Sequence, residues 1–157
     1  MNAVAPPELN PVSQALVKAR YINAAIWLIA LALNVVALGL FWVSWWYWGF
    51  IVIAAFGAWL AWLIPAQVRN MGWLETDDEL LITRGKLWHP ITVIPYGRIQ
   101  FVDVTAGPIQ RWLGIKKLQL HTASATTDAT VKGLPAQTAD QLRERLAVKA
   151  RERMSGL

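Results

Sequence analysis

Two absences mark this 157-residue sequence: it has no cysteine, and it has no charged residue or histidine between positions 21 and 68. Without cysteine, a disulfide framework, a thiolate nucleophile and a Cys-ligated metal site are all excluded. The uncharged interval holds 48 residues, dense in Ala, Leu, Ile, Val and Trp, and lies between Arg20 and Arg69. Because one bilayer crossing takes roughly 20 apolar residues, the interval is long enough for two crossings and too long for one.

The interval predicts a transmembrane hairpin with helices over about residues 21–42 and 48–65. The segment between them is rich in Trp and Tyr, which concentrate at membrane–water interfaces. The interface anchors expected there are Trp42, Trp45, Trp46, Tyr47 and Trp48. A single bent or re-entrant segment is the alternative. A cleaved signal peptide fits poorly, because its apolar core is only about 7–15 residues long.

The charges flanking the apolar interval predict its orientation. Lys18 and Arg20 precede the first helix, Arg69 follows the second, and the turn between the helices is uncharged. By the positive-inside rule, both ends of the chain face the cytoplasm. We therefore expect a cytoplasmic tail (1–20), a hairpin in the cell (inner) membrane (21–68) and a cytoplasmic domain (69–157). The formal net charge of +5 lies mostly in this last segment.

From residue 72 the sequence changes to short alternating runs separated by turns, which is typical of β-strands. Strands are expected over residues 73–76, 79–84, 87–94, 99–105, 117–122 and 127–132. The end of the chain is helical, because Ala139, Leu142, Leu146 and Ala150 fall on one helix face. Several strands followed by one helix predict a small barrel or curved sheet capped by that helix.

Three motifs resemble a known family when they are taken in order. They are Arg84-Gly85-Lys86-Leu87-Trp88, then Val93-Ile94-Pro95-Tyr96-Gly97-Arg98-Ile99-Gln100, then Gly107-Pro108-Ile109-Gln110-Arg111-Trp112-Leu113-Gly114-Ile115. With the paired helices upstream, they resemble the bacterial pleckstrin-homology (PH) domains of the YdbS-like membrane proteins, over residues 15 to 150. The resemblance implies a membrane-anchored α+β fold. In that fold, a two-helix transmembrane hairpin precedes a PH-like bent antiparallel β-sheet or barrel capped by the C-terminal helix.

The sequence contains no recognisable catalytic constellation. His89 and His121 lie in different predicted strands without metal-ligand spacing, and the HExxH, GxSxG and Gly-rich phosphate-loop motifs are missing. The acidic cluster at 77–79 is interpreted as a solvated hairpin tip and not as a cation site. We expect no enzyme activity, no catalytic residue, no metal and no cofactor.

A binding role is therefore expected. Candidate lipid- or partner-binding residues are the basic positions Arg84, Lys86, Arg98, Arg111, Lys116 and Lys117. Ordinary surface charge is the simpler interpretation of all six. Asn34 is the one polar residue deep in a predicted helix, and we expect it to make an interhelical hydrogen bond.

We favour a non-enzymatic scaffold or adaptor at the cytoplasmic face that binds another membrane protein or self-associates as a homo-oligomer. Recognition of anionic lipid by the loops around Arg111, Lys116 and Lys117 is the alternative, and a subunit of a transport complex is a weaker one. Apart from the lipid bilayer and such a protein, no partner is expected. Nucleic acid is not expected, because membrane tethering makes DNA binding an awkward use.

Overall fold

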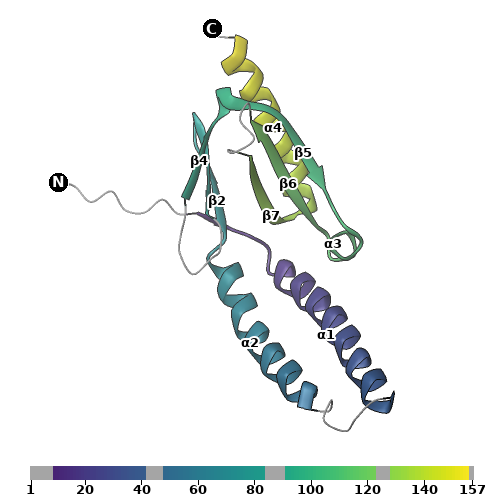
Figure 1. Ribbon diagram of the computed structural model, residues 1–157. Coiled ribbons are helices and arrows are strands. Elements are labelled where there is room, and N and C mark those ends of the chain that lie inside the picture. The colour runs from purple at the N-terminus through teal and green to yellow at the C-terminus, as the bar shows by residue number, and fades with distance from the viewer. Residues whose placement is uncertain (1–8, 42–47, 84–90, 123–127, 156–157) are drawn as a thin grey trace, which may run out of the picture.

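The computed structural model describes residues 9–41, 48–83, 91–122 and 128–155. An apolar helical hairpin projects from one end of a β-rich domain, and the C-terminal helix ends at the opposite end (Figure 1). The hairpin consists of α1 (Ala15–Phe41) and α2 (Gly49–Arg69). Both helices are long and apolar enough to cross a membrane. The predicted anchors at 42 and 45–47 lie outside the described residues.

Both helices extend beyond the ranges expected from the sequence. α1 begins at Ala15 and not near position 21, because the Ser13 hydroxyl accepts a hydrogen bond from the Ala15 N–H (3.2 Å) and so caps the first turn. α2 continues through Pro65 to Arg69. The helices therefore extend past the apolar interval into the β domain.

The helices of the hairpin pack closely where one of them carries a glycine. A Cβ at Gly49 would lie 3.2 Å from Val35, and one at Gly57 would lie 3.5 Å from Leu28. Near the domain, the Tyr21 hydroxyl donates a hydrogen bond to the Ala61 carbonyl (2.7 Å). The outer surfaces of both helices remain uncovered by the described part of the chain.

Large apolar side chains point away from the hairpin along its whole length. Trp27 is 70% exposed, Leu40 72% and Val52 68%. A core helix of a soluble domain buries such residues, whereas a membrane span leaves them to lipid. The exposure therefore supports the expectation of a membrane-anchored hairpin.

The β domain contains two antiparallel sheets. The first has the order β1–β2–β3–β4, formed by Asn10–Pro11, Gly72–Glu75, Glu79–Thr83 and Ile91–Pro95. The second has the order β5–β6–β7, formed by Ile99–Thr105, Ile115–Thr122 and Ala129–Pro135. A one-turn 3-10 helix, η2 (Tyr96–Arg98), joins the sheets, and α3 (Pro108–Trp112) joins β5 to β6.

The strands match the expected pattern with shifted ends. β6 starts two residues earlier than expected and β7 ends three residues later, while the first part of the strand expected over 87–94 lies outside the described residues. The β1 pairing was not predicted, because two residues carry no periodic signal. Gly114 ends α3 with φ of +67°, which only glycine adopts easily.

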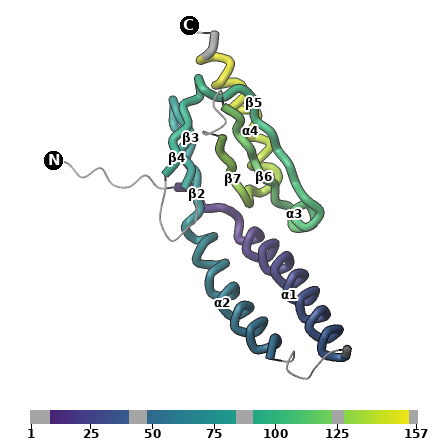
Figure 2. Tube along the Cα trace, in the orientation of Figure 1, coloured from purple at the N-terminus to yellow at the C-terminus, as the bar shows by residue number. Residues whose placement is uncertain are grey.

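The C-terminal helix α4 (Ala136–Ser155) packs across the second sheet and closes the core (Figure 2). Its apolar face, with Leu142 and Leu146 fully buried, meets Leu118 and Leu120 of β6. This bent double sheet with a closing helix is the PH-like arrangement expected from the sequence.

A second, smaller core joins the hairpin to the domain. Val12, Leu16, Ala19, Val68 and Ile115 are buried together, and Ile109 and Leu113 of α3 pack against them. A Cβ at Gly133 would lie 2.7 Å from Leu16, so only a glycine at this point of β7 leaves room for α1. The start of α1 is therefore docked on the β domain and is not a loose tether.

Candidate functional site

The six basic candidates do not form one site. Arg84 and Lys86 lie outside the described residues. Arg98 ends η2, and its neighbour Gly97 lies beside Arg153 near the end of α4, away from the hairpin. Arg111, Lys116 and Lys117 lie on α3 and at the start of β6, close to the hairpin. The expected anchor Trp48, just before α2, is 68% exposed.

Local contacts distinguish the basic residues near the hairpin. The Lys116 Nζ forms an ion pair with Asp140 of α4 (2.7 Å), so its charge is compensated within the chain. Arg111 is exposed, and its Nη2 donates only a long hydrogen bond to the Ala106 carbonyl (3.5 Å). Lys116 therefore also contributes a contact between β6 and α4, whereas Arg111 has no such ion pair among the described residues.

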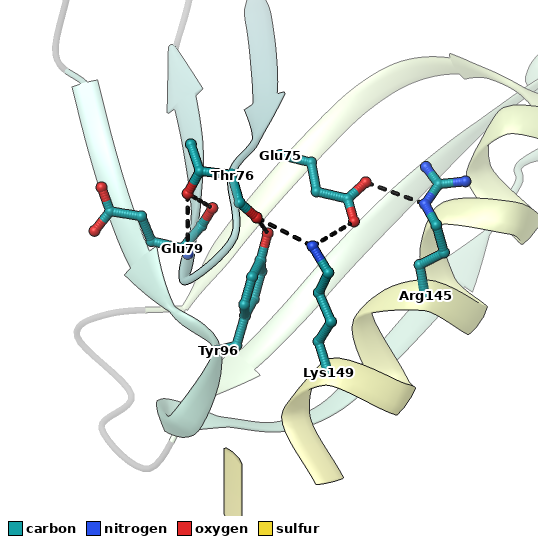
Figure 3. Close-up of polar contacts among 6 residues, drawn as sticks. All are labelled: Glu75, Thr76, Glu79, Tyr96, Arg145 and Lys149. Carbon is teal, nitrogen blue, oxygen red and sulfur yellow. Dashed lines mark hydrogen bonds and ion pairs between the residues drawn. The ribbon is translucent and has the colours of Figure 1, made fainter. Parts of the chain in front are cut away.

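Sequence reasoning missed a polar network that fastens α4 to the first sheet (Figure 3). Glu75 of β2 accepts hydrogen bonds from Arg145 and Lys149, at 3.1 Å each. The Thr76 carbonyl accepts hydrogen bonds from the Tyr96 hydroxyl (2.7 Å) and from the Lys149 Nζ (3.1 Å). The basic face of α4 is thus tied through Arg145 to an acidic residue 70 positions away. In the sequence, only the i, i+4 spacing of Arg145 and Lys149 points to this polar network.

The network includes two side chains, Tyr96 and Lys149, whose pKa values are both raised. Burial raises the pKa of the Tyr96 hydroxyl above its ordinary value. For Lys149, burial acts to lower the pKa, but the hydrogen bond to Glu75 and the nearby charges outweigh it and raise the pKa. The ammonium also lies 4.9 Å from the Tyr96 ring centroid, where the negative face of the ring favours a cation. The network therefore holds α4 firmly at neutral pH.

One consequence of this docking is a groove of about 480 Å³ between β5 and α4. One wall is formed by residues 99–102 of β5 and the other by one face of α4. Apolar atoms form most of the lining, with Phe101 and Val148 each 52% exposed, while Arg143 and Arg151 border it. In the described part of the chain, β5 pairs only with β6, so no strand occupies its other edge. The groove therefore combines an open strand edge with a partly apolar wall.

The histidines offer no metal site in the described ranges, which contain no cluster of three His, Asp or Glu residues able to hold an ion. His89 lies outside those ranges. His121 stacks on Phe101 (4.2 Å between ring centroids) and contacts Asp128 through Nδ1 at 3.1 Å. Asp128 also accepts a hydrogen bond from the Thr122 N–H, so this contact closes the end of the β6–β7 hairpin.

An apolar two-helix hairpin followed by a bent double sheet with a closing helix defines the class: a membrane-associated protein with a PH-like domain. A family model described as Bacterial PH domain matches residues 15–150. The UPF0699 transmembrane protein YdbS of Bacillus subtilis (strain 168) is 31% identical over 141 residues, covering 83% of this chain and 82% of that protein. No solved structure matches. The chain belongs to the bacterial PH-domain family.

Proposed function

We propose that this protein is a non-enzymatic, membrane-tethered adaptor whose PH-like domain binds an extended segment of another membrane-associated protein. The observation that carries the proposal is the open edge of β5 beside the partly apolar wall of α4. An extended peptide can add to such an edge as a further strand, with main-chain hydrogen bonds supplying affinity and side-chain pockets supplying specificity.

The chemistry of the groove favours a particular kind of segment. Phe101 and Val148 provide apolar surface for an aliphatic or aromatic side chain of the peptide. Arg143 and Arg151 outnumber Glu144 at the border, so acidic residues flanking that side chain are favoured. The partner is therefore an extended apolar segment with acidic neighbours.

Tethering supports the same role. Strand β2 begins at Gly72, three residues after α2 ends at Arg69, so the β domain is held close to the membrane, and the groove opens toward the end of the domain away from the hairpin. Restricting a binding module to the membrane surface raises its effective concentration for partners in the same membrane. We place both chain ends and the β domain on the cytoplasmic side of the cell membrane, because the flanking charges obey the positive-inside rule.

A photo-crosslinking amino acid at position 101, in intact membranes, tests the adaptor proposal. We expect it to capture a distinct protein, and we expect Val148→Arg to reduce that capture at least fivefold, because the new charge occupies the apolar wall. The matched control carries the crosslinker at Val93, an exposed apolar residue of β4, which is an edge strand of the first sheet. Equal capture from positions 101 and 93, or capture unaffected by Val148→Arg, contradicts a specific groove on β5.

One observation favours self-association as a second function. Asn34 is exposed on α1, roughly 21 Å along the helix from Arg20 at 1.5 Å per residue, and hydrogen-bonds to nothing in the described part of the chain. An amide side chain in the hydrocarbon core is stabilised when it hydrogen-bonds to another polar group. The same amide of a second copy is such a group. Asn23, Trp27, Ala30 and Asn34 follow the 4-3-4 spacing of helix pairs on one stripe of α1.

A further inference from the structure

A second groove, of about 700 Å³, lies where the hairpin meets the β domain. Its body is apolar and is built from both helices of the hairpin, with Trp27, Leu28, Leu31, Phe56 and Leu60 among the lining residues. Its domain end is polar and is bordered by Arg20, Gln110 and Lys132. An apolar groove with a cationic end is complementary to an amphiphile that has an anionic headgroup.

Arg20 lacks a counter-charge among the residues that the structure describes. Its side chain is half-buried, with Nη1 donating to the Gln67 Oε1 (2.8 Å) and Nη2 lying 3.5 Å from the Met71 Sδ. Both partners are neutral, and no carboxylate of the described residues forms an ion pair with this guanidinium. A half-buried cation held by neutral groups is costly unless an anion joins it. Three of its five N–H donors remain for such an anion.

Two lysines add further positive charge without a compensating carboxylate among the described residues. Lys132 of β7 stands directly opposite Lys117 of β6, and like charges in that position repel. Neither lysine forms an ion pair with a described residue, whereas the neighbouring Lys116 is paired with Asp140. Arg20, Lys132 and Lys117 thus bring positive charge to one end of the hairpin without a compensating carboxylate among the described residues.

We propose that this groove binds one anionic phospholipid from the leaflet that faces the β domain. The phosphate lies between Arg20 and Lys132, and an acyl chain lies along Trp27, Leu28 and Phe56 between the two helices. A helix from a second copy is the competing occupant, but the hairpin contains no Asp or Glu between residues 21 and 68, so it offers no counter-charge. An anionic lipid supplies both the chain and the charge.

The test compares two lipids with identical chains, dioleoyl phosphatidylglycerol and dioleoyl phosphatidylcholine, bound to the full-length protein in neutral detergent. Native mass spectrometry counts the lipid molecules retained by each protein molecule. We expect the wild type to retain one phosphatidylglycerol in preference to phosphatidylcholine. We expect R20Q/K132Q to weaken phosphatidylglycerol binding roughly thirtyfold, since each basic residue near an anionic surface is worth about a factor of five. The control K18Q/R69Q removes the same charge from exposed positions that do not line this groove and should bind as the wild type does.

Two further variants keep the proposal falsifiable if loss of Arg20 disturbs packing. Arg20→Lys retains the charge and should keep the preference for phosphatidylglycerol. Ala24→Phe leaves every charge in place but fills the apolar body, so it should abolish retention of both lipids. Equal retention of the two lipids by the wild type, unchanged retention by Ala24→Phe, or a dimer that retains no lipid would each overturn the proposal. The adaptor proposal concerns the groove beside β5 and is unaffected by any of these outcomes.

Discussion

Tyr96 connects three parts of the β domain through one side chain. Its ring is fully buried, its hydroxyl donates to the Thr76 carbonyl in the turn after β2, and its backbone N–H donates to the Asp78 carbonyl at 3.1 Å. Lys149 of α4 also donates a hydrogen bond to the Thr76 carbonyl. A buried hydroxyl with a satisfied hydrogen bond stabilises by roughly 1 kcal/mol, and an orphaned acceptor costs more. Here Lys149 keeps the carbonyl satisfied even when the hydroxyl is removed.

Tyr96→Phe should therefore lower the free energy of unfolding by only about 1 kcal/mol at pH 7. At alkaline pH the wild type should lose further stability. Both Tyr96 and Lys149 have pKa values raised above the ordinary 10.0 and 10.5, so the folded state holds these protons more tightly than the unfolded state. Their contribution is complete below about pH 10 and is lost as pH rises through the folded pKa values. Tyr96→Phe should make this alkaline loss smaller.

Thermal unfolding of the full chain in neutral detergent, followed by circular dichroism between pH 7 and pH 11.5, measures both effects. Tyr21→Phe is the matched control, because its hydroxyl donates to a backbone carbonyl of the hairpin and not to this network. A wild-type melting temperature that stays constant through pH 11, or an equal alkaline loss in Tyr96→Phe, would contradict the assignment.

At the scale of elements, α1 differs from an ordinary membrane anchor. The first turns of α1 pack on Gly133 and on α3, and Leu28 and Val35 contact α2. Asn34 takes part in neither of these contacts. A lone amide in an apolar helix is worth on the order of 1 kcal/mol when it pairs with another helix. Because no residue of the described chain pairs with this amide, we propose that a helix from outside the chain does.

Asn34→Leu should weaken association of the hairpin without affecting the fold of a single chain. We expect a two- to tenfold shift of the monomer–dimer equilibrium toward monomer, from the loss of an interhelical hydrogen bond of that size. Sedimentation equilibrium in density-matched detergent gives the constant directly. Ala37→Leu changes an exposed position of the same helix without removing an amide and serves as the control. If wild type and Asn34→Leu are both monomeric throughout, the self-association proposal is wrong.

For the whole molecule, the decisive property is which parts lie on which side of the membrane. The chain has no native cysteine, so single cysteines can be introduced without background labelling. A cysteine at position 44, which lies between α1 and α2 in the sequence, should react with a membrane-impermeant maleimide on intact cells. A cysteine at Gln137, exposed at the start of α4, should react only after permeabilisation. The reverse pattern, or labelling of both in intact cells, would exclude a double crossing with both ends inside.

Much of the architecture follows from local patterns in the sequence. The uncharged interval predicts the hairpin, since length and apolarity alone decide what can span a bilayer. Alternation predicts the strands, and the 3.6-residue spacing predicts α4. The ends of elements were less predictable, because they depend on single contacts. The Ser13 cap moves the start of α1 to Ala15, and the pairing of Asn10 with Trp73 creates β1 where no periodicity exists.

The candidate sites were the least predictable part, because each depends on groups far apart in the chain. In sequence, Arg20 is a flanking charge that sets topology, and only the fold places it against Gln67, 47 positions away, without a carboxylate. In sequence Lys116 does not differ from its neighbour Lys117, and only the fold places Asp140 beside it. Hydrophobicity and period are properties of short segments and can be read along the chain. The compensation of a charge depends on three-dimensional neighbours, so only the tertiary structure decided which cations remain available.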